Sequence, residues 1–324
     1  MSNAFRLLAD IGGTNARFAW QAGPGQPLQH VQVMQCHDHA GLAEAVECWL
    51  DAYQLPKPHQ DGVAVACAVH SDQIQLTNNP WSFSIQALQT RLGLDRLEVV
   101  NDFTALALGL PFVPAHHLHR LGGDPAQRPF EWEAPVALLG AGTGLGVSGL
   151  LPDRRGGWMP ISGEGGHISL SVHTEGQYQV LTALQTRYGH VSAERVLSGQ
   201  GLVNIHDCLW RQRTGHWPPQ SFTPAQITTL ALEKRDPLAM EVIAYFCSWL
   251  GSVAGDLVLT LGARGGVFIG GGIVPRLAQV LASSALRTSF EHKGRFSTYL
   301  HPVPIWVIDT PVSPALDGVA MLLD

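Results

Sequence analysis

Two glycine-rich stretches constrain the fold of this chain more than any other feature of its sequence. The first covers residues 7–17 and the second covers residues 136–146. In each, an apolar run leads into a turn of glycine and threonine and a second run follows, which predicts a β-hairpin. Glycine adopts φ > 0 in a tight turn, and without a Cβ it lets backbone N–H groups approach an anion. The pair predicts a duplicated fold that grips a polyphosphate from two sides.

Neither stretch defines a phosphate site by itself, because a single glycine turn is more often an ordinary hairpin. Neither matches G-x-x-x-x-G-K-[ST], and a strand rather than a helix follows the glycines. These features exclude the P-loop and the dinucleotide-binding fingerprint. The phosphate interpretation therefore depends on the pair and on the polar residues described below.

Length, charge and cysteine content narrow the class of protein. A chain of 324 residues with net charge −6 fits two domains or one large one, and it does not favour nucleic-acid binding. Its lysines are Lys57, Lys234 and Lys293, so a phosphate site must rely on backbone N–H groups, arginine and a metal ion. The five cysteines are odd in number and form no C-x-x-C pair, which is typical of reduced thiols. With no signal peptide or membrane-length apolar run, we expect a soluble, cytoplasmic protein that contacts no membrane.

The remaining periodicity predicts strands separated by helices, which is an α/β fold with helices packed on mixed sheets. A Pro-, Gly- and His-rich stretch at 111–135 is the predicted linker. We expect strands at 5–11, 16–20, 28–36, 62–69, 97–100, from 136, 146–151, 158–161, 266–269 and 304–308. We expect helices at 41–53, 82–92 (capped by Ser82 or Ser84), 103–110, 176–188, 192–197, 224–232, 237–261, 275–281 and 314–323.

Two polar clusters are candidates for chemistry. Asn101 and Asp102 end a predicted buried strand, where ligands bind in open α/β sheets, and Asp102 there could accept a proton from a hydroxyl. The local sequence alone favours a helix cap for this carboxylate. In Ser162-Gly163-Glu164-Gly165-Gly166-His167, glycines surround a carboxylate and an imidazole. Four-coordinate zinc needs further ligands nearby, so hydrogen bonds to a polyol are the better use of Glu164 and His167. For His116, His117 and His119, a solvated loop is favoured over a metal site.

The order of these motifs resembles the actin-like sugar kinases, most closely the bacterial glucokinases without a zinc motif. The resemblance runs from about residue 7 to residue 311, and residues 311–320 lack the glycine-rich stretch expected there. The cysteine-rich motif and helix-turn-helix of the wider repressor–kinase superfamily are absent, which removes a repressor function. The six motifs lie at residues 10–15, 97–105, 140–146, 163–167, 189–199 and 265–276.

The resemblance implies two actin-like (ribonuclease H-like) domains with an interdomain cleft. The small domain would cover 1–110, completed by a C-terminal helix at about 312–324, and the large domain would cover 111–311. The chain would phosphorylate D-glucose with ATP and Mg²⁺ and feed glycolysis, and it would form a homodimer. The alternatives are a kinase for another hexose and an actin-like ATPase without a sugar substrate.

The resemblance also assigns roles to single residues. Asp102 would be the general base on the 6-hydroxyl, and Asp10 would hold Mg²⁺ through water. The sugar contacts would be Asn101, Asp102, Glu164, His167 and Glu194. The nucleotide contacts would be Asp10, Ile11, Gly12, Gly13, Thr14, Asn15, Gly142, Thr143, Gly271 and Gly272.

Overall fold

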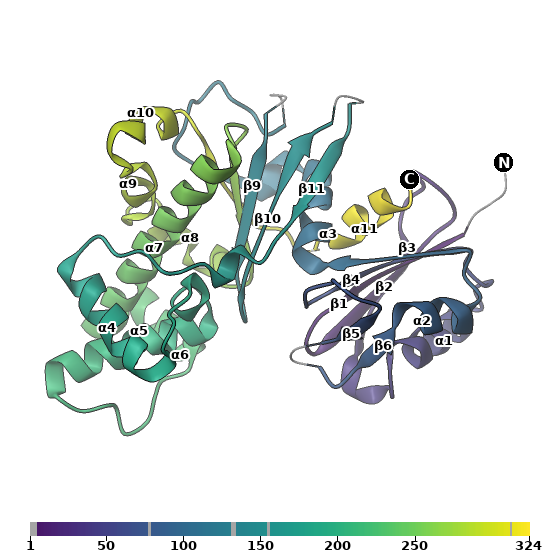
Figure 1. Cartoon of the computed structure of the whole chain (residues 1–324), viewed down its shortest axis with the longest axis horizontal. Helices are drawn as coiled ribbons and strands as arrows, with labels where there is room; N and C mark the ends of the chain where they lie inside the picture. The colour runs from purple at the N-terminus through teal and green to yellow at the C-terminus, as the bar shows by residue number, and fades with distance from the viewer. Residues whose placement is uncertain (1–4, 77–78, 131–133, 154–155, 312) are drawn as a thin grey trace. The chain divides into compact units, whose positions relative to one another are not determined.

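The computed structural model describes residues 5–76, 79–130, 134–153, 156–311 and 313–324. It divides into two compact units, drawn in Figure 1. Unit 1 lies within residues 1–113, 158–162 and 311–324, and unit 2 lies within 114–157 and 163–310. The domain limits expected from the sequence stay a prediction, because a compact unit is not yet a domain that folds alone.

Unit 1 is built on a sheet whose strands alternate between two apolar cores. Leu7, Ala9 and Ile11 face one core, whereas Leu8 faces the other, as the two-residue period of a strand requires. Helices α1 (Leu42–Tyr53) and α2 (Ile85–Leu92) cover the first face, and α3 (Asp102–Gly109) and α11 (Ala315–Leu322) cover the second (Figure 1). The strand order is β3 (Gln29–Gln35), β2 (Asn15–Gln21), β1 (Arg6–Ile11), β4 (Gln60–Val65) and β7 (Arg96–Asn101).

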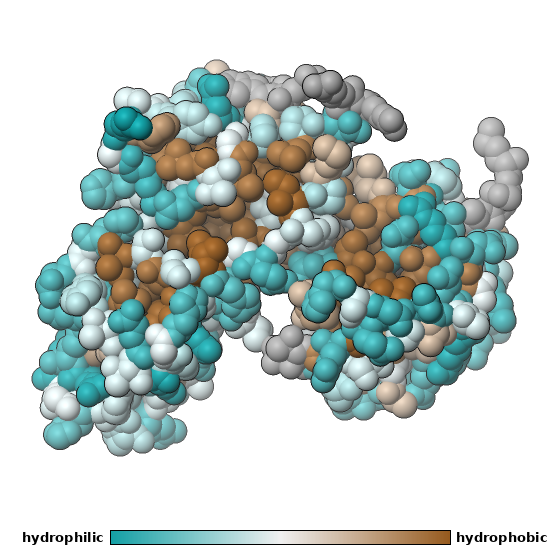
Figure 2. All heavy atoms as spheres, viewed as in Figure 1, coloured by the Kyte–Doolittle hydropathy of each residue, from teal (hydrophilic) through white to brown (hydrophobic). Residues whose placement is uncertain are grey.

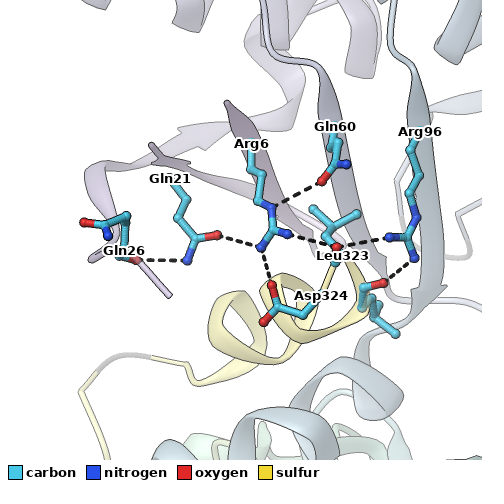
Figure 3. A network of polar contacts seen from close by, with 8 residues as sticks. Arg6, Gln21, Gln26, Gln60, Arg96, Leu323 and Asp324 are labelled. Carbon is cyan, nitrogen blue, oxygen red and sulfur yellow. Dashed lines mark hydrogen bonds and ion pairs between the residues drawn. The ribbon is translucent and has the colours of Figure 1, made fainter. Parts of the chain in front are cut away.

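The C-terminal helix belongs to unit 1 because glycines let it approach α3 closely. A Cβ on Gly318 would lie 1.8 Å from the Ala105 carbonyl oxygen, and one on Gly109 would lie 2.0 Å from that of Pro314. Hydrophobic residues gather in this region of unit 1 (Figure 2). Beyond the helix, Arg6 and Arg96 both donate hydrogen bonds to the Leu323 carbonyl oxygen, at 2.9 and 3.0 Å (Figure 3). The last turn of the chain is therefore fixed to the sheet at its first and last parallel strands.

Unit 2 repeats the plan of unit 1, a glycine hairpin followed by parallel strands. Strand β10 (Leu145–Pro152) pairs antiparallel with β9 (Val136–Ala141), and β9 pairs parallel with β12 (Val267–Gly270). Strand β13 (Ile305–Ile308) follows, and β8 (Leu118–Leu121) pairs with it antiparallel. The helices are α4 (Glu175–Tyr188), α5 (Gly199–Thr214), α6 (Pro224–Leu232), α7 (Pro237–Leu261), α8 (Ala278–Leu281), α9 (Leu286–Glu291) and α10 (Ser297–Leu300).

Helix α7 is long and apolar enough to cross a membrane by length and composition, yet it is mostly buried inside the protein. Phe246, Trp249 and Leu250 on this helix are fully buried in the core of unit 2. The expectation that the chain has no apolar run of membrane length was therefore wrong for residues 237–261. The burial of α7 identifies it as a core helix of unit 2.

Short elements complete the two units. In unit 1, β5 (Gln73–Gln75) pairs with β6 (Ser82–Ser84), and β11 (Trp158–Ser162) contacts α3 through a 3.1 Å hydrogen bond between the Thr104 and Ser162 hydroxyls. Three-residue 3-10 helices lie at Cys36–Asp38, Leu110–Phe112, Ala115–His117, Gly165–His167, Ala193–Arg195, Pro275–Leu277 and Gly294–Phe296.

Several expected elements differ from the structure. The predicted strand 62–69 ends at Val65, and the predicted helix 192–197 is only a 3-10 turn. Ser82 lies in β6, so Ser84 is the residue that caps α2, accepting a hydrogen bond from the Ala87 N–H. The predicted linker contains β8, while its residues 131–133 lie outside the described residues. Helices α9 and α10 escape the sequence pattern because they are only six and four residues long.

The largest omission is α5, a helix of 16 residues that the sequence analysis does not predict. It begins with Gly199-Gln200-Gly201, and glycine disfavours a helix interior. The Ser198 side chain accepts a hydrogen bond from the Gly201 N–H at 3.0 Å, which caps the helix despite these glycines. The cap, together with burial, outweighs the weak local propensity, because every residue from 201 to 209 is buried and the helix is therefore covered on all sides there.

Candidate functional site

The predicted site residues of unit 1 meet at one edge of its sheet. Ile11, Val65 and Asn101 lie in register across the parallel strands β1, β4 and β7. The carboxyl ends of these strands therefore share an edge, where the first glycine loop and Asp102 both follow. This is the edge at which ligands bind in parallel α/β sheets.

The first glycine loop is a hairpin turn, as predicted, but neither Gly12 nor Gly13 has the positive φ expected in such a turn. Gly12 has no positive φ, and its N–H donates a 2.9 Å hydrogen bond to the Asn15 carbonyl oxygen. Gly13 is partly exposed and Thr14 is exposed, so the turn presents backbone to solvent. The Cys36 N–H donates a 2.8 Å hydrogen bond to the Thr14 carbonyl oxygen from the neighbouring segment. A Cβ on Gly12 would lie 3.5 Å from the Asn15 carbonyl oxygen, an ordinary contact distance, so neither a left-handed conformation nor close packing distinguishes this position.

The side chain of Asn79, a residue that the sequence gives no reason to select, also holds this loop in place. Its side chain is buried, and its Nδ2 donates a 3.1 Å hydrogen bond to the Gly12 carbonyl oxygen. Its Oδ1 accepts a 2.9 Å hydrogen bond from the Trp81 N–H. Both ends of the amide are therefore used to hold the loop. An asparagine in an irregular stretch before a buried tryptophan gives no local pattern that would reveal this role.

Asp10 lies just before the loop and is ion-paired. Arg17 Nη1 is 2.9 Å from Asp10 Oδ2, across the β1–β2 ladder in which the two residues are opposite each other. Burial raises the pKa of Asp10, while the Arg17 guanidinium opposes that shift. A carboxylate with a partly exposed side chain beside a backbone turn fits Mg²⁺, which prefers oxygen ligands and keeps several waters.

The sequence left open whether Asp102 is a proton acceptor or a helix cap, and the structure assigns the cap to its neighbour Asn101. Asn101 is the N-cap of α3: its Oδ1 accepts the Phe103 N–H at 2.8 Å, and its Nδ2 donates to the Cys67 carbonyl oxygen at 3.1 Å. Asp102 is the first helical residue, and its Oδ1 also accepts the Phe103 N–H, at 2.9 Å. The cap is therefore supplied by Asn101, so the carboxylate of Asp102 is not required for it.

Unit 2 contains the second glycine loop. The Gly142 N–H donates a 2.8 Å hydrogen bond to the Gly144 carbonyl oxygen, and the Gly199 N–H donates one of 2.8 Å to the Gly142 carbonyl oxygen. Thr143 is exposed at the tip. Neither Gly142 nor Gly144 has the positive φ expected of them. A Cβ on Gly142 would meet no atom within 4 Å, whereas one on Gly144 would lie 2.5 Å from Glu194 Oε2, so close approach requires glycine at Gly144.

The loop and the Glu194 segment are joined by a side chain. The Leu145 N–H donates a 2.9 Å hydrogen bond to Glu194 Oε2. Glu194 lies in the 3-10 turn Ala193–Arg195 and is half-buried. One predicted sugar contact therefore touches the predicted phosphate loop.

Glu164 directly precedes the 3-10 turn Gly165–His167, His167 is its last residue, and both are exposed. The turn fits against the loop region because a Cβ on Gly166 would lie 2.0 Å from the Leu145 carbonyl oxygen. A bridge between Ser169 and Ser192 links this segment to the one that carries Glu194. The segments that carry Glu164, His167 and Glu194 therefore lie close to the second glycine loop in unit 2.

Gly271 and Gly272 follow β12 beside the same loop. Gly271 has φ +88°, and a Cβ there would lie 2.3 Å from the Ala141 carbonyl oxygen. The Ile273 N–H donates a 3.3 Å hydrogen bond to that oxygen. Here glycine is required both by its backbone angle and by close packing, and both glycines are exposed.

Metal-ligand side chains also gather away from these loops. In the described ranges, the side-chain ligand atoms of His39, Glu44 and Cys48 lie within 4.8 Å of one another. Glu44 Oε2 already accepts a 2.6 Å hydrogen bond from the Ala40 N–H, at the start of α1. The histidines of the predicted loop are not part of this group, and His117 Nδ1 instead lies 2.8 Å from the Asp309 carbonyl oxygen.

Two α/β units, each with a glycine hairpin (β1–β2 in unit 1 and β9–β10 in unit 2), define the actin-like ATPase fold that sugar kinases share. A glucokinase from an Antarctic psychrotroph has a crystal structure with TM-score 0.86 and 33% identity, covering 99% of this chain and 98% of that one. A glucokinase of the ROK family from Streptomyces griseus, in complex with glucose and AMPPNP, has the same fold at 18% identity, with TM-score 0.62 and 98% of both chains covered.

Sequence comparison identifies the family. The model of the glucokinase family matches residues 7–324. A glucokinase from Aromatoleum aromaticum is 48% identical over 323 residues, covering 98% of this chain and 94% of that protein. This chain therefore belongs to the glucokinase family.

Proposed function

We propose that this chain transfers the γ-phosphoryl group of ATP to the 6-hydroxyl of D-glucose, giving glucose 6-phosphate for glycolysis. Membership of the glucokinase family supports this activity. The observation that carries the proposal is the hydrogen bond from the Leu145 N–H to Glu194. It joins the loop that we expect to bind phosphate to a carboxylate that we expect to bind sugar hydroxyls. An ATPase without a sugar substrate gives no role to Glu164, His167 and Glu194.

Phosphoryl transfer passes through a loose transition state, so the protein contributes mainly positioning and charge neutralisation. The exposed backbone of the loop at Gly12, Gly13 and Thr14 and of the loop at Gly142 and Thr143 would supply N–H groups to the phosphates. Ile11 and Asn15 would support the first loop at its two ends. Gly271 and Gly272 would let adenosine lie against backbone. Mg²⁺ would neutralise phosphate charge, held by Asp10 through water.

Asp102 would accept the proton of the glucose 6-hydroxyl. It is the first residue of α3, and the N-terminus of a helix favours negative charge, which keeps a proton acceptor available. Glu164, His167 and Glu194 would hold the other hydroxyls as acceptors and donors. Asn101 would contribute through its position beside Asp102, since its amide already caps α3.

The test is a coupled assay of ADP release across a panel of sugars. Glucose should raise ADP release at least about tenfold over the sugar-free rate, because the site is complete only when the acceptor is bound. Faster turnover with fructose, mannose or an N-acetyl-hexosamine would identify that hexose, rather than glucose, as the preferred substrate. Equal release with and without sugar would favour the ATPase alternative.

Asp102→Asn tests the base directly. The variant keeps the shape of the side chain and leaves the Asn101 cap in place, so kcat should fall by on the order of 10²–10⁴-fold. Glucose affinity should change much less, since an amide oxygen still accepts a hydrogen bond. Near-normal turnover would reduce Asp102 to a structural residue.

We further propose that the protein acts in the cytoplasm as a homodimer, without nucleic acid or membrane as a partner. Reduced cysteines and the net charge of −6 support the first and third parts of this proposal. Sedimentation at several protein concentrations measures the oligomeric state. A monomer at micromolar concentration would contradict the homodimer.

A further inference from the structure

Glu194 is built into the second glycine loop more tightly than a sugar contact requires. Its Oε2 accepts the Leu145 N–H at 2.9 Å, and Leu145 directly follows Gly142-Thr143-Gly144. A Cβ on Gly144 would lie 2.5 Å from that same Oε2. The carboxylate therefore packs against the loop at a distance that only a glycine allows.

The segment that carries Glu194 is itself anchored to the loop. The Ser198 hydroxyl donates a 2.9 Å hydrogen bond to the Glu194 carbonyl oxygen, which fixes the turn. One residue further on, the Gly199 N–H donates a 2.8 Å hydrogen bond to the Gly142 carbonyl oxygen. The loop is thus held at its first residue by backbone and at its end by the Glu194 side chain.

Glu164 provides an internal comparison. It is exposed and belongs to the same unit, but in the described part of the chain no hydrogen bond joins its side chain to the loop. Two glutamates with the same expected role toward sugar therefore differ in their contact with the loop and in their burial, since Glu164 is exposed and Glu194 is half-buried.

We propose that Glu194 is a positioning residue for the second phosphate loop, so that one carboxylate links nucleotide affinity to sugar affinity. The inference about sugar rests on the proposed function, whereas the inference about the loop rests on the geometry of unit 2. Oε2 is engaged by the Leu145 N–H, and Oε1 is the oxygen that would accept a sugar hydroxyl. A hydroxyl on Oε1 restricts the carboxylate and the loop together, which lowers the ordering cost of binding phosphate. Because such coupling is reciprocal, ATP would raise sugar affinity by the same factor.

The experiment measures AMPPNP affinity by calorimetry in the absence of sugar. Glu194→Ala leaves the Leu145 N–H without its partner, so AMPPNP should bind roughly 5- to 30-fold less tightly. Glu164→Ala should bind AMPPNP within about twofold of the unmodified protein, although it loses glucose affinity. Unchanged AMPPNP affinity in Glu194→Ala would overturn the proposal.

Glu194→Gln separates the two roles and covers the case in which Glu194→Ala fails to fold. Its amide oxygen can still accept the Leu145 N–H, so sugar-free AMPPNP affinity should return close to normal. Glucose should bind Glu194→Gln more weakly than it binds the unmodified protein. The increase in AMPPNP affinity caused by saturating glucose should therefore be smaller in the variant. AMPPNP affinity as low in Glu194→Gln as in Glu194→Ala would contradict the hydrogen-bond mechanism. Normal glucose binding in both Glu164→Ala and Glu194→Ala would remove the sugar assignment while leaving the loop result intact.

Discussion

Arg17 pairs with Asp10 across the first hairpin, with Nη1 2.9 Å from Oδ2 and the two residues opposite each other in the β1–β2 ladder. Burial raises the pKa of Asp10, and this guanidinium is the group that opposes the shift. Arg17 therefore favours the ionised carboxylate that a magnesium site requires.

Replacing Arg17 with alanine should weaken the use of MgATP. Without the guanidinium, burial is unopposed and Asp10 holds its proton more strongly, so we expect kcat/KM for MgATP to fall by on the order of 10-fold or more. Arg17→Lys restores a positive charge and should recover part of that loss. Steady-state kinetics at several Mg²⁺ concentrations provide the measurement. An alanine variant with normal Mg²⁺ dependence would separate Asp10 from the metal.

Asn79 offers a test of the first loop that does not touch its glycines. Asn79→Asp keeps the acceptor for the Trp81 N–H but removes the donor to the Gly12 carbonyl oxygen. We expect the KM for ATP to rise roughly 3- to 10-fold, with a loss of stability of about 1–2 kcal/mol because the partly buried Gly12 carbonyl oxygen loses its hydrogen bond. Asn79→Ala removes both contacts and should be less stable still. If Asn79→Asp has an unchanged KM for ATP, the loop does not depend on this brace.

The α/β fold and the two hairpins could be predicted from sequence because they depend on local patterns. The alternation of apolar residues around Leu7 and the apolar runs beside the glycines report burial directly. Helix α5 could not be predicted in this way, because its stability comes from the Ser198 cap and from packing rather than from propensity. Strand β8 could not be predicted for a similar reason, because a short edge strand is defined by its pairing with β13 rather than by a local pattern.

The candidate site was predicted as a set of motifs, but not as a set of contacts. The resemblance supplied Glu194 and Gly144 as members of separate motifs, whereas their contact depends on residues 50 positions apart in the chain meeting in unit 2. The positive φ expected in the first hairpin was wrong, because neither Gly12 nor Gly13 adopts one. Asn79 was missed because its amide acts on a loop 67 residues away.

Asp61 predicts how stability depends on pH. It is 1% exposed on β4, and within the described residues neither carboxylate oxygen has a hydrogen-bond partner. Burial raises the pKa of Asp61 well above its ordinary value, and the nearby Gly62 N–H offsets only part of the shift. An acid with a raised folded-state pKa binds its proton more tightly when folded. Its contribution to stability is therefore full below about pH 3.9 and is lost as pH rises through the folded-state pKa.

Asp61→Asn removes this titration without changing the size of the side chain. The variant should unfold with a free energy about 1–3 kcal/mol higher than the unmodified protein at neutral pH, and the gain should disappear toward pH 4. Urea unfolding at intervals between pH 4 and pH 8 measures both curves. Parallel curves would mean that Asp61 makes no distinct contribution to the pH dependence.

Arg6 and Arg96 hold the end of the C-terminal helix through the Leu323 carbonyl oxygen, and we call this pair of contacts the clamp. We expect Arg6 to stabilise the protein more than an exposed arginine does. Its side chain is 3% exposed, and it donates to Asp324 Oδ1 at 2.6 Å and to the Leu323 carbonyl oxygen at 2.9 Å (Figure 3). Arg6→Met keeps the apolar stem but leaves these acceptors with fewer partners. We expect a loss of about 2–4 kcal/mol, because the hydrogen bonds that the buried guanidinium donates to the Leu323 carbonyl oxygen and to its other acceptors are strong, while the exposed Asp324 carboxylate contributes the smaller part.

Arg91 is the matched control. It makes two hydrogen bonds to Glu47, at 2.9 and 2.7 Å, but both side chains are exposed, so Arg91→Met should cost much less stability than Arg6→Met. Denaturant unfolding of both variants gives the comparison. The Arg6 variant should also expose the end of α11 first, and hydrogen exchange at residues 315–322 reports that opening. Equal losses for the two variants would show that the clamp stabilises unit 1 no more than a surface ion pair does.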